Sequence, residues 1–588
     1  MCVDTIMKTT LLAAGSLLAA TFAMPAFGQS GYEVWASDQS NSVAGADGPG
    51  LVGSYIWIWD QDAIEAQIAG GPDAQPLPCV PGQGTKTGKS KKGASAATGP
   101  CDLNEVFPAS LAEYDADGNA TGATLGDLTR FGRLHGMLVD PQQRYLTANI
   151  FAPSGGYVGI IDTKSKGAVA LFRVTETNGT GVARSVHMSY WDGAGDSIIV
   201  ANLHGKVLER IDVSRNGSGK IKSATFNRSA SLGVGKGMEI TAGATYFLGK
   251  NAQGRKLVSA MGGDYAEADF GDLTPNGYCK ENGCASGPDA PMGGRGNNVI
   301  ICPIPSTNGN AYVTMGGGGL LVAKSGETPM QIVGEYGSEV VNGAGCGGVQ
   351  AGDDMWLNAG VSASGAGATQ STFTIYAVDD AAFDDGANPP DMPVPVTVFK
   401  DATNTNTIGN SDGVSAPNTT GQLPGVTTRR DSHGMDVTLG GGYMHTLDRI
   451  QNVVEVFNTA TLARSTYDLT SADGHGNGTG PCEAYGVGDD PALPSNDPAP
   501  DLAERTPDGK YLTVAFRGPN PVSVGHAAQG SCPGVGIVEF LDGGASGRLV
   551  TVLRTSNSVD TTDAASPGGY AYSGAEHSDV HGVIVVGK

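Results

Sequence analysis

The sequence predicts an all-β fold, a single β-propeller for which seven blades is the best count. Three observations lead to this prediction. Glycine supplies 90 of the 588 residues, about twice the usual share, and glycine disfavours helices. A unit of short strands recurs along the chain, and the two chain ends carry complementary parts of one such unit.

The recurring unit is a strand, a polar turn, a second strand and, in most copies, a third strand that ends near an aspartate or asparagine. Four clear copies begin at His135 (HGMLVDPQQRYLTANIF), Val186 (VHMSYWDGAGDSIIVAN), His433 (HGMDVTLGGGYMHTLD) and Ala503 (AERTPDGKYLTVAF), and two weaker copies begin near Val299 and Cys346. Units of three or four strands, repeated about every 50–80 residues without helical periodicity, indicate propeller blades.

The chain ends are expected to close the ring. Residues 32–38 (YEVWASD) and 55–60 (YIWIWD) resemble a second and a third strand, and residues 581–586 (HGVIVV) resemble a first strand. One blade built from both ends would remove the exposed sheet edges. Together with the six copies this makes seven blades. The stretch from Gly217 to Phe270 could hold another, so the count stays open between six and eight.

The domain plan is a signal peptide over residues 1–28 and a propeller over 29–588. Lys8, the apolar run 11–22 and the small residues around Ala26 and Gly28 form a charged, an apolar and a cleavage region. We expect a periplasmic or secreted protein without a membrane span. Within the propeller, three segments rich in proline, glycine or aspartate are expected to be long loops: 71–105, 383–428 and 470–500.

Eight cysteines remain after removal of the leader, and an even number in an exported chain predicts disulfides. The easiest local pairs are Cys79–Cys101 and Cys279–Cys284, which would leave Cys302–Cys346 and Cys482–Cys532. Spacing alone does not fix this connectivity.

The net charge limits the partners. The chain has 36 lysines and arginines against 59 aspartates and glutamates, a formal charge of −23. Nucleic acids and anionic membrane surfaces require a basic face, so we expect neither as a partner. A small-molecule substrate remains, and the lysines between 86 and 92 could steer an anionic one. A periplasmic electron-transfer partner is a further option.

Histidines mark the starts of the repeats. His135, His187, His433 and His581 each open the first, innermost strand of a blade, and His204 and His577 lie close to these starts. The sequence therefore predicts that up to six imidazoles meet at one mouth of the central channel. Imidazole is a common ligand of copper, iron and zinc. For any one histidine, a hydrogen bond to a neighbouring blade is the competing interpretation.

The repeat openings carry a family resemblance. The pattern HGM-x-V, a turn, and then Arg144-Tyr145-Leu146 or Lys510-Tyr511-Leu512 resembles the YVTN-type propeller repeat. This resemblance covers most of the mature chain and implies the fold rather than a chemistry. The histidine-rich channel mouth is loosely similar to copper propellers, namely the propeller domain of nitrous oxide reductase and the thiocyanate dehydrogenases.

These observations favour an enzyme without requiring one. The first hypothesis is a copper-dependent oxidoreductase that acts on a small molecule, with iron or zinc as alternative metals. All six histidines are candidate metal ligands, and the candidate catalytic residues are His204, His577, Arg184 and Asp431. The alternatives are a non-catalytic exported binding propeller and a lactonase-like hydrolase, which would need a channel lined by carboxylates.

Overall fold

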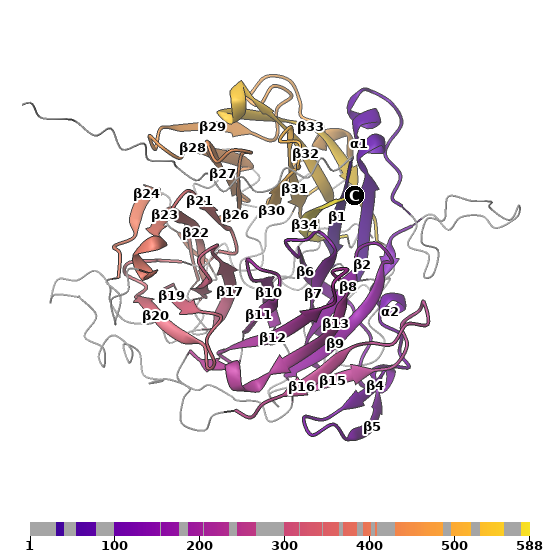
Figure 1. The fold of residues 1–588 in the computed structure, drawn as a ribbon. Helices are drawn as coiled ribbons and strands as arrows, with labels where there is room; N and C mark the ends of the chain where they lie inside the picture. Colours follow the sequence, from indigo (N-terminus) through magenta and orange to yellow (C-terminus); the bar gives the residue numbers. More distant parts are fainter. Residues whose placement is uncertain are drawn as a thin grey trace, which may run out of the picture.

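The computed structural model describes residues 31–39, 54–77, 99–152, 154–175, 186–203, 205–234, 244–265, 299–316, 318–343, 345–363, 369–384, 392–401, 406–408, 430–485, 496–518, 530–557 and 578–588 (Figure 1). Within these ranges the chain forms an all-β propeller, as the sequence predicts. The expected signal peptide lies outside the described residues. No helix in the described ranges has both the length and the apolar character needed to span a bilayer.

Six sheets each contain four strands that follow one another in the chain and pair antiparallel. They are β6 (Arg133–Val139), β7 (Tyr145–Ala152), β8 (Gly155–Asp162) and β9 (Gly167–Thr175); β10 (Val186–Trp191), β11 (Ser197–Asn202), β12 (Val207–Arg215) and β13 (Ile221–Asn227); β17 (Ile300–Pro305), β18 (Asn310–Met315), β19 (Leu320–Lys324) and β20 (Gln331–Tyr336); β21 (Gly348–Ala351), β22 (Asp354–Ala363), β23 (Thr369–Asp379) and β24 (Val396–Lys400); β26 (Ser432–Val437), β27 (Tyr443–Asp448), β28 (Val453–Asn458) and β29 (Arg464–Asp468); and β30 (Pro500–Arg505), β31 (Tyr511–Phe516), β32 (Gly534–Leu541) and β33 (Ser546–Arg554).

A further sheet joins the two ends of the chain, as the sequence predicts. Its order is β34 (Val580–Gly587), β1 (Tyr32–Asp38), β2 (Tyr55–Asp60) and the two-residue β3 (Cys101–Asp102). The last strand lies antiparallel to the first, with Val585 opposite Val34. The ring therefore closes by hydrogen bonds between residues more than 500 positions apart.

The blade count needs a correction. The structure has six blades of four consecutive strands, whereas the sequence analysis counts the composite closing sheet as an equivalent seventh blade. The described residues between Gly217 and Phe270 form no further blade. Their described strands extend existing sheets: β14 (Leu232–Gly233) pairs with β12, β16 (Ser259–Gly262) with β13, and β15 (Thr245–Leu248) with β9.

Short elements decorate the outer edges of the sheets. The segment expected as a loop over 383–428 supplies β24 and β25 (Asn406–Ile408). The other elements are β4 (Ala112–Tyr114), β5 (Ala120–Thr124), α1 (Gln61–Ile68), α2 (Leu103–Val106), α3 (Leu125–Leu128), α6 (Cys482–Tyr485), η1 (Arg228–Ala230), η2 (Ala381–Asp384) and η3 (Asp542–Gly544).

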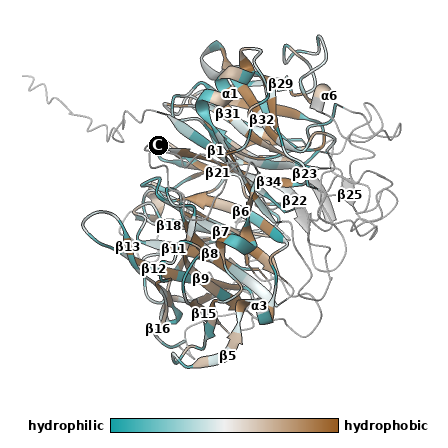
Figure 2. Cartoon of the chain, turned by 90° about the vertical axis from the view of Figure 1, so that its right-hand side faces the viewer, coloured by the Kyte–Doolittle hydropathy of each residue, from teal (hydrophilic) through white to brown (hydrophobic). Residues whose placement is uncertain are grey.

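The core lies between adjacent sheets rather than at the axis. Strands such as β7 and β8 are buried along their whole length, so they are hydrophobic on both faces (Figure 2). The closing sheet packs Trp57 and Trp59 of β2 in one cluster with Val535 and Ile537 of β32. Hydrophobic contacts between neighbouring sheets thus hold the ring together. Polar side chains can therefore lie along the central axis.

Two disulfides lie within the described residues, and both confirm pairs left by the sequence analysis. Cys302–Cys346 joins β17 to the residues just before β21, and Cys482–Cys532 joins α6 to the residues before β32. Cys79, Cys279 and Cys284 lie outside the described residues, so the other two expected pairs remain predictions.

Candidate functional site

The innermost strands carry a β-bulge near their start. In β6, Leu134 lies opposite Ile150 and Gly136 lies opposite Asn149, so His135 is an extra residue without a partner in the ladder. The same kind of register shift contains His187 in β10, Cys302 in β17, His433 in β26, Asp501 in β30 and His581 in β34. A bulge redirects the side chain of its extra residue. Here the bulges place one functional side chain from each of six inner strands in a common cluster.

Glycine after histidine has a steric reason at these bulges. A Cβ atom at Gly434 would lie 2.1 Å from the carbonyl oxygen of Asp501, and one at Gly136 would lie 2.6 Å from Sδ of Met188. No side chain fits where one inner strand passes this close to the next. The close packing of the inner strands therefore explains why glycine follows histidine in these repeats.

The structure brings four of the predicted histidines together. Nε2 of His135 lies 3.1 Å from Nε2 of His187. The ring of His135 stacks on that of His581 with centroids 4.0 Å apart, and the His581 and His433 rings are 5.8 Å apart. All four side chains belong to residues that are at most 9% exposed. The cluster is thus buried inside the ring rather than open at a channel mouth.

Hydrogen bonds fix the tautomers of the first pair. Nε of Arg133 donates to Oε1 of Gln39 at 3.0 Å, which identifies that oxygen as an acceptor. Nδ1 of His135 lies 3.3 Å from the same oxygen and must carry a hydrogen. Burial, followed by the neighbouring His581 and His187, holds the pKa of His135 well below its usual value, so its ring is neutral.

The tautomer of His135 determines how it contacts His187. Since neutral His135 carries its hydrogen on Nδ1, its Nε2 has a lone pair and accepts from Nε2–H of His187. The other ring nitrogen of His187 is Nδ1. That atom lies 3.7 Å from Sγ of Cys302 and 3.7 Å from Sγ of Cys346.

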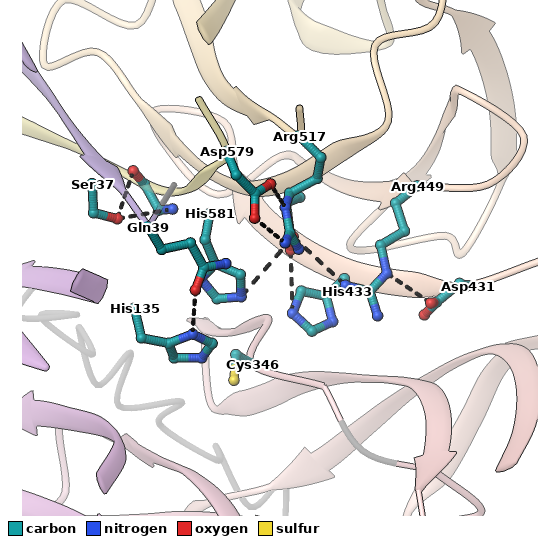
Figure 3. Close-up of polar contacts among 12 residues, drawn as sticks. Ser37, Gln39, His135, Cys346, Asp431, His433, Arg449, Arg517, Asp579 and His581 are labelled. Carbon is teal, nitrogen blue, oxygen red and sulfur yellow. Dashed lines mark hydrogen bonds and ion pairs between the residues drawn. The ribbon is translucent and has the colours of Figure 1, made fainter. Parts of the chain in front are cut away.

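A buried network of carboxylates and guanidinium groups borders the histidines (Figure 3). Arg517 donates to both carboxylate oxygens of Asp579, at 2.6 and 2.8 Å, and to Oδ2 of Asp501 at 2.7 Å. Nε of Arg449 donates to Oδ2 of Asp431 at 2.7 Å, and its Nη1 lies 3.6 Å from Oδ2 of Asp501. Three carboxylates face two guanidinium groups, so the network keeps an excess of negative charge.

Asp501 links this network to the histidines. Its Oδ1 lies 3.2 Å from Nε2 of His433, and its Oδ2 lies 4.0 Å from Nε2 of His581. Burial alone would raise the pKa of Asp501, but His581, Arg517 and Arg449 lower it, so the carboxyl is ionised. Burial also lowers the pKa of His581 well below its usual value, although Asp501 opposes this shift. The group therefore combines a carboxylate with a neutral imidazole.

Oδ1 of Asp501 and Nδ1 of His581 are among the buried side-chain atoms that have no hydrogen-bond partner in the described residues. Buried polar atoms are usually satisfied, and an exception in a native fold calls for an explanation such as a bound ion. The potential ligand atoms of His433, Asp501 and His581 all lie within 4.8 Å of one another. Two imidazoles and one carboxylate are a donor set that binds zinc or ferrous iron.

A second group of potential ligands consists of His187, Cys302 and Cys346, also within 4.8 Å of one another. Both sulfur atoms belong to the disulfide. A thiolate rather than a disulfide sulfur is the metal ligand. In the oxidised protein this group therefore does not form a metal site.

An axial cavity of about 380 Å³ lies toward the other end of the inner strands, and the described residues that line it include neither the four histidines nor Asp501. Its wall includes Met137, Leu502 and Val583 from three inner strands, and Met188 and Cys346 lie at its boundary. Met188 follows His187 in the chain, and Sγ of Cys346 contacts His187. The disulfide thus lies between the cavity and the histidines.

The remaining predicted site residues divide into two groups. Asp431 lies in the network through Arg449. Arg184, His204 and His577 lie outside the described residues, so their assignment as ligands or catalytic groups remains a prediction. His445 is buried away from the cluster, where Nδ1 contacts the Tyr467 hydroxyl at 3.0 Å and Nε2 contacts the Gly544 carbonyl at 2.8 Å.

Sequence reasoning missed several members of the cluster. They are Gln39, Cys302, Arg449, Asp501 and Arg517. A weaker repeat begins near Val299, but alignment of its strand with the histidine strands places Ile301 at the histidine position and Cys302 one residue later. The same alignment, extended three residues before Ala503, would have placed Asp501 at the histidine position.

Comparisons with known proteins concern the fold. No family model matches the chain, and no curated protein matches its sequence. Similar solved structures include a Lactobacillus plantarum protein (9% identity, TM-score 0.41, 94% of this chain and 99% of that chain). They also include a putative 6-phosphogluconolactonase from Bacteroides uniformis (11%, 0.38, 89% and 98%) and the periplasmic gluconolactonase of Pseudomonas aeruginosa (10%, 0.38, 90% and 98%). Similarity at this level carries no conclusion about activity.

Proposed function

We propose that the chain is an exported metal-dependent enzyme whose ion is held by His433, Asp501 and His581, and that it hydrolyses a small cyclic ester. The observation that carries this proposal is the buried Oδ1 of Asp501, which accepts no hydrogen bond from the described residues and faces Nε2 of His433 at 3.2 Å. A cation bound beside these atoms would compensate the buried negative charge of Asp501. Export is supported by the two disulfides and by the amino-terminal pattern.

The surrounding charges suit a cation. Arg517 and Arg449 approach Asp501 only at Oδ2, so Oδ1 remains directed at His433. Asp431 and Asp579 balance the two guanidinium groups, which leaves the charge of Asp501 for the ion. Neutral imidazole and ionised carboxylate are the protonation states that metal binding requires. His581 must approach the other two ligands, because bonds of about 2.0–2.2 Å need closer donors than the present 4.0 Å from Asp501.

Hydrolysis follows from the donor set. The four imidazoles expected from the sequence favour copper, but His135 and His187 are hydrogen-bonded to each other, and this leaves two imidazoles and a carboxylate for the ion. A divalent ion bound by such a set supplies Lewis acidity and a more acidic water. The lactonase alternative calls for carboxylates near the channel, and the buried carboxylates Asp431, Asp501 and Asp579 lie beside the histidines without lining the axial cavity.

Copper redox chemistry is the second candidate. It is favoured by one observation, that His135 and His187 lie beside His581 and would supply further nitrogen ligands if their mutual hydrogen bond opened. This candidate needs an external electron acceptor, for which an exported electron-transfer protein would serve. A copper ion would be expected to displace the hydrogen between the two rings.

Metal analysis tests the site. The purified protein is stripped with a chelator, reloaded separately with zinc, ferrous iron, manganese or copper, and the bound ion is counted by mass spectrometry. We expect one ion per chain for the unchanged protein and for the control His475→Gln, whose side chain is exposed. Asp501→Asn and His433→Gln should lose it. If none of the metals binds the unchanged protein more tightly than it binds Asp501→Asn, both candidates are wrong and a binding propeller remains.

Activity separates the two candidates. Zinc-loaded protein is assayed for release of acid from a six-membered sugar lactone, with Asp501→Asn as the inactive reference. Hydrolysis by the unchanged protein alone supports the hydrolase. If only copper binds stoichiometrically, cycles between its oxidation states and leaves the lactone intact, the hydrolase assignment is wrong and the oxidoreductase replaces it.

A further inference from the structure

The Cys302–Cys346 disulfide occupies the ring of ligand positions. The bulge of β17 that contains Cys302 corresponds to the bulges that present His187 and His433. Cys346 lies two residues before β21, the one inner strand without a bulge. Five inner strands therefore carry a histidine or an aspartate in this ring, and the remaining two inner strands, β17 and β21, carry or closely follow the two cysteines of the disulfide.

His187 connects this cystine to the histidine cluster. Its Nε2 lies 3.1 Å from Nε2 of His135, and its Nδ1 lies 3.7 Å from both sulfur atoms. Neither sulfur of a disulfide has a hydrogen to donate to that nitrogen. Two thiols would donate to it, and two thiolates would share a metal ion with it.

A reductant has a route to the disulfide. Cys346 lies at the boundary of the axial cavity of about 380 Å³, together with Met188 and Tyr190. Cys302 itself is completely buried. A small dithiol in the cavity can therefore attack Sγ of Cys346 and displace Sγ of Cys302.

We propose that reduction of Cys302–Cys346 by a dithiol creates a second metal site, formed by Nδ1 of His187 and the two Sγ atoms, for a soft ion such as zinc or cuprous copper. The protein disulfide accepts two electrons and two protons, and the dithiol becomes a cyclic disulfide. Binding of the ion then releases the two thiol protons. One imidazole and two thiolates match the ligand preference of these ions, which bind sulfur and nitrogen strongly.

This site is separate from the one at His433, Asp501 and His581, since the two share no ligand. It goes beyond the proposed hydrolase, because it exists only in the reduced protein. Its ion would bind Nδ1 of His187 while Nε2–H stays bonded to His135. The oxidised and reduced proteins should thus differ by one bound soft ion.

Cobalt(II) is the probe, because a thiolate–cobalt bond gives a charge-transfer absorption in the near ultraviolet that imidazole and carboxylate ligands do not give. Protein reduced with a dithiol and desalted without oxygen is titrated beside oxidised protein. We expect the absorption to saturate at one ion per chain in the reduced protein only. Cys302→Ser/Cys346→Ser should abolish it, whereas the matched control Cys482→Ser/Cys532→Ser, which removes the other disulfide, should keep it.

To guard against a failure of the cysteine variants to fold, a second test uses a variant of the third ligand that keeps the disulfide. His187→Gln should weaken cobalt binding by the reduced protein at least about tenfold, because one of three ligands is lost. Asp501→Asn should leave the absorption unchanged, and this separates failure of this proposal from failure of the hydrolase site. The proposal is overturned if native protein yields no thiols with the dithiol, if the absorption survives in Cys302→Ser/Cys346→Ser, or if His187→Gln binds cobalt as tightly as the unchanged protein.

Discussion

Glu504 makes the stability of the propeller depend on pH in a way that can be calculated. It lies on the inner strand β30, three residues after Asp501, in the wall of the axial cavity. Its Oε2 accepts a hydrogen bond of 3.0 Å from the backbone N–H of Val585. Burial, helped by Asp436, raises the pKa of Glu504 from 4.5 to about 8. The folded protein therefore keeps this carboxyl protonated at neutral pH.

The sign follows from proton linkage. Between the unfolded pKa of 4.5 and the folded pKa of about 8, the folded state holds a proton that the unfolded state releases. The free energy of unfolding should therefore fall as pH rises through this window. At 1.36 kcal/mol for each pKa unit, Glu504 contributes a loss of at most about 4 kcal/mol between pH 5 and pH 8.

The assay compares unfolding by urea at pH 5, 6, 7 and 8 for the unchanged protein and Glu504→Gln. Glutamine keeps an acceptor for Val585 and does not ionise. The variant should match the unchanged protein within about 1 kcal/mol at pH 5 and become the more stable of the two at pH 8. Glu539→Gln, near the surface beside Arg548, is the control and should show no such trend. A difference between Glu504→Gln and the unchanged protein that is constant over this pH range would refute the reasoning.

Three further outcomes are expected. Gly434→Ala places a methyl group 2.1 Å from a backbone oxygen of the next inner strand and should destabilise the fold by about 1–3 kcal/mol. The control Gly326→Ala meets open space and should have little effect, and thermal unfolding of both variants measures the difference. Arg517→Met leaves Asp579 as a buried, uncompensated carboxylate and should cost about 3–5 kcal/mol in urea, with partial recovery in Arg517→Met/Asp579→Asn. Burial lowers the pKa of His445 to about 4, so the stability it contributes should be lost as pH falls from 6.5 to 4; urea unfolding of His445→Gln should show a weaker dependence on pH over that range.

The closure of the ring could be predicted because it depends on strand patterns that are local in the sequence. YEVWASD lacks a first strand and HGVIVV lacks a second, and β1 and β34 indeed pair. The histidine cluster could be predicted because four copies of one repeat carry imidazole at the same position. What repeats in sequence also repeats in space when the fold is a ring.

The acidic and sulfur members of the site could not be predicted in the same way. Asp501 stands at the histidine position of its strand but is a different residue type, so a search for repeated histidines passes over it. Cys302 lies one residue after that position in its own strand. Arg449 and Arg517 follow the second strands, β27 and β31, of the blades that carry His433 and Asp501, and they reach the site through long side chains. Their partners depend on the arrangement of the sheets around the ring.

Burying this many charged side chains costs free energy, and this suggests that the cluster has a role besides stabilising the fold. Buried ion pairs are often replaced by apolar residues without loss of stability, and the propeller is already held by apolar contacts between its sheets. Arg517 and Asp579 show what a satisfied structural pair looks like here, with two parallel hydrogen bonds. Asp501 differs, since one of its oxygens is buried without a hydrogen bond among the described residues and faces an imidazole. The proposed cation would account for this arrangement, because it would place a positive charge beside the buried carboxylate.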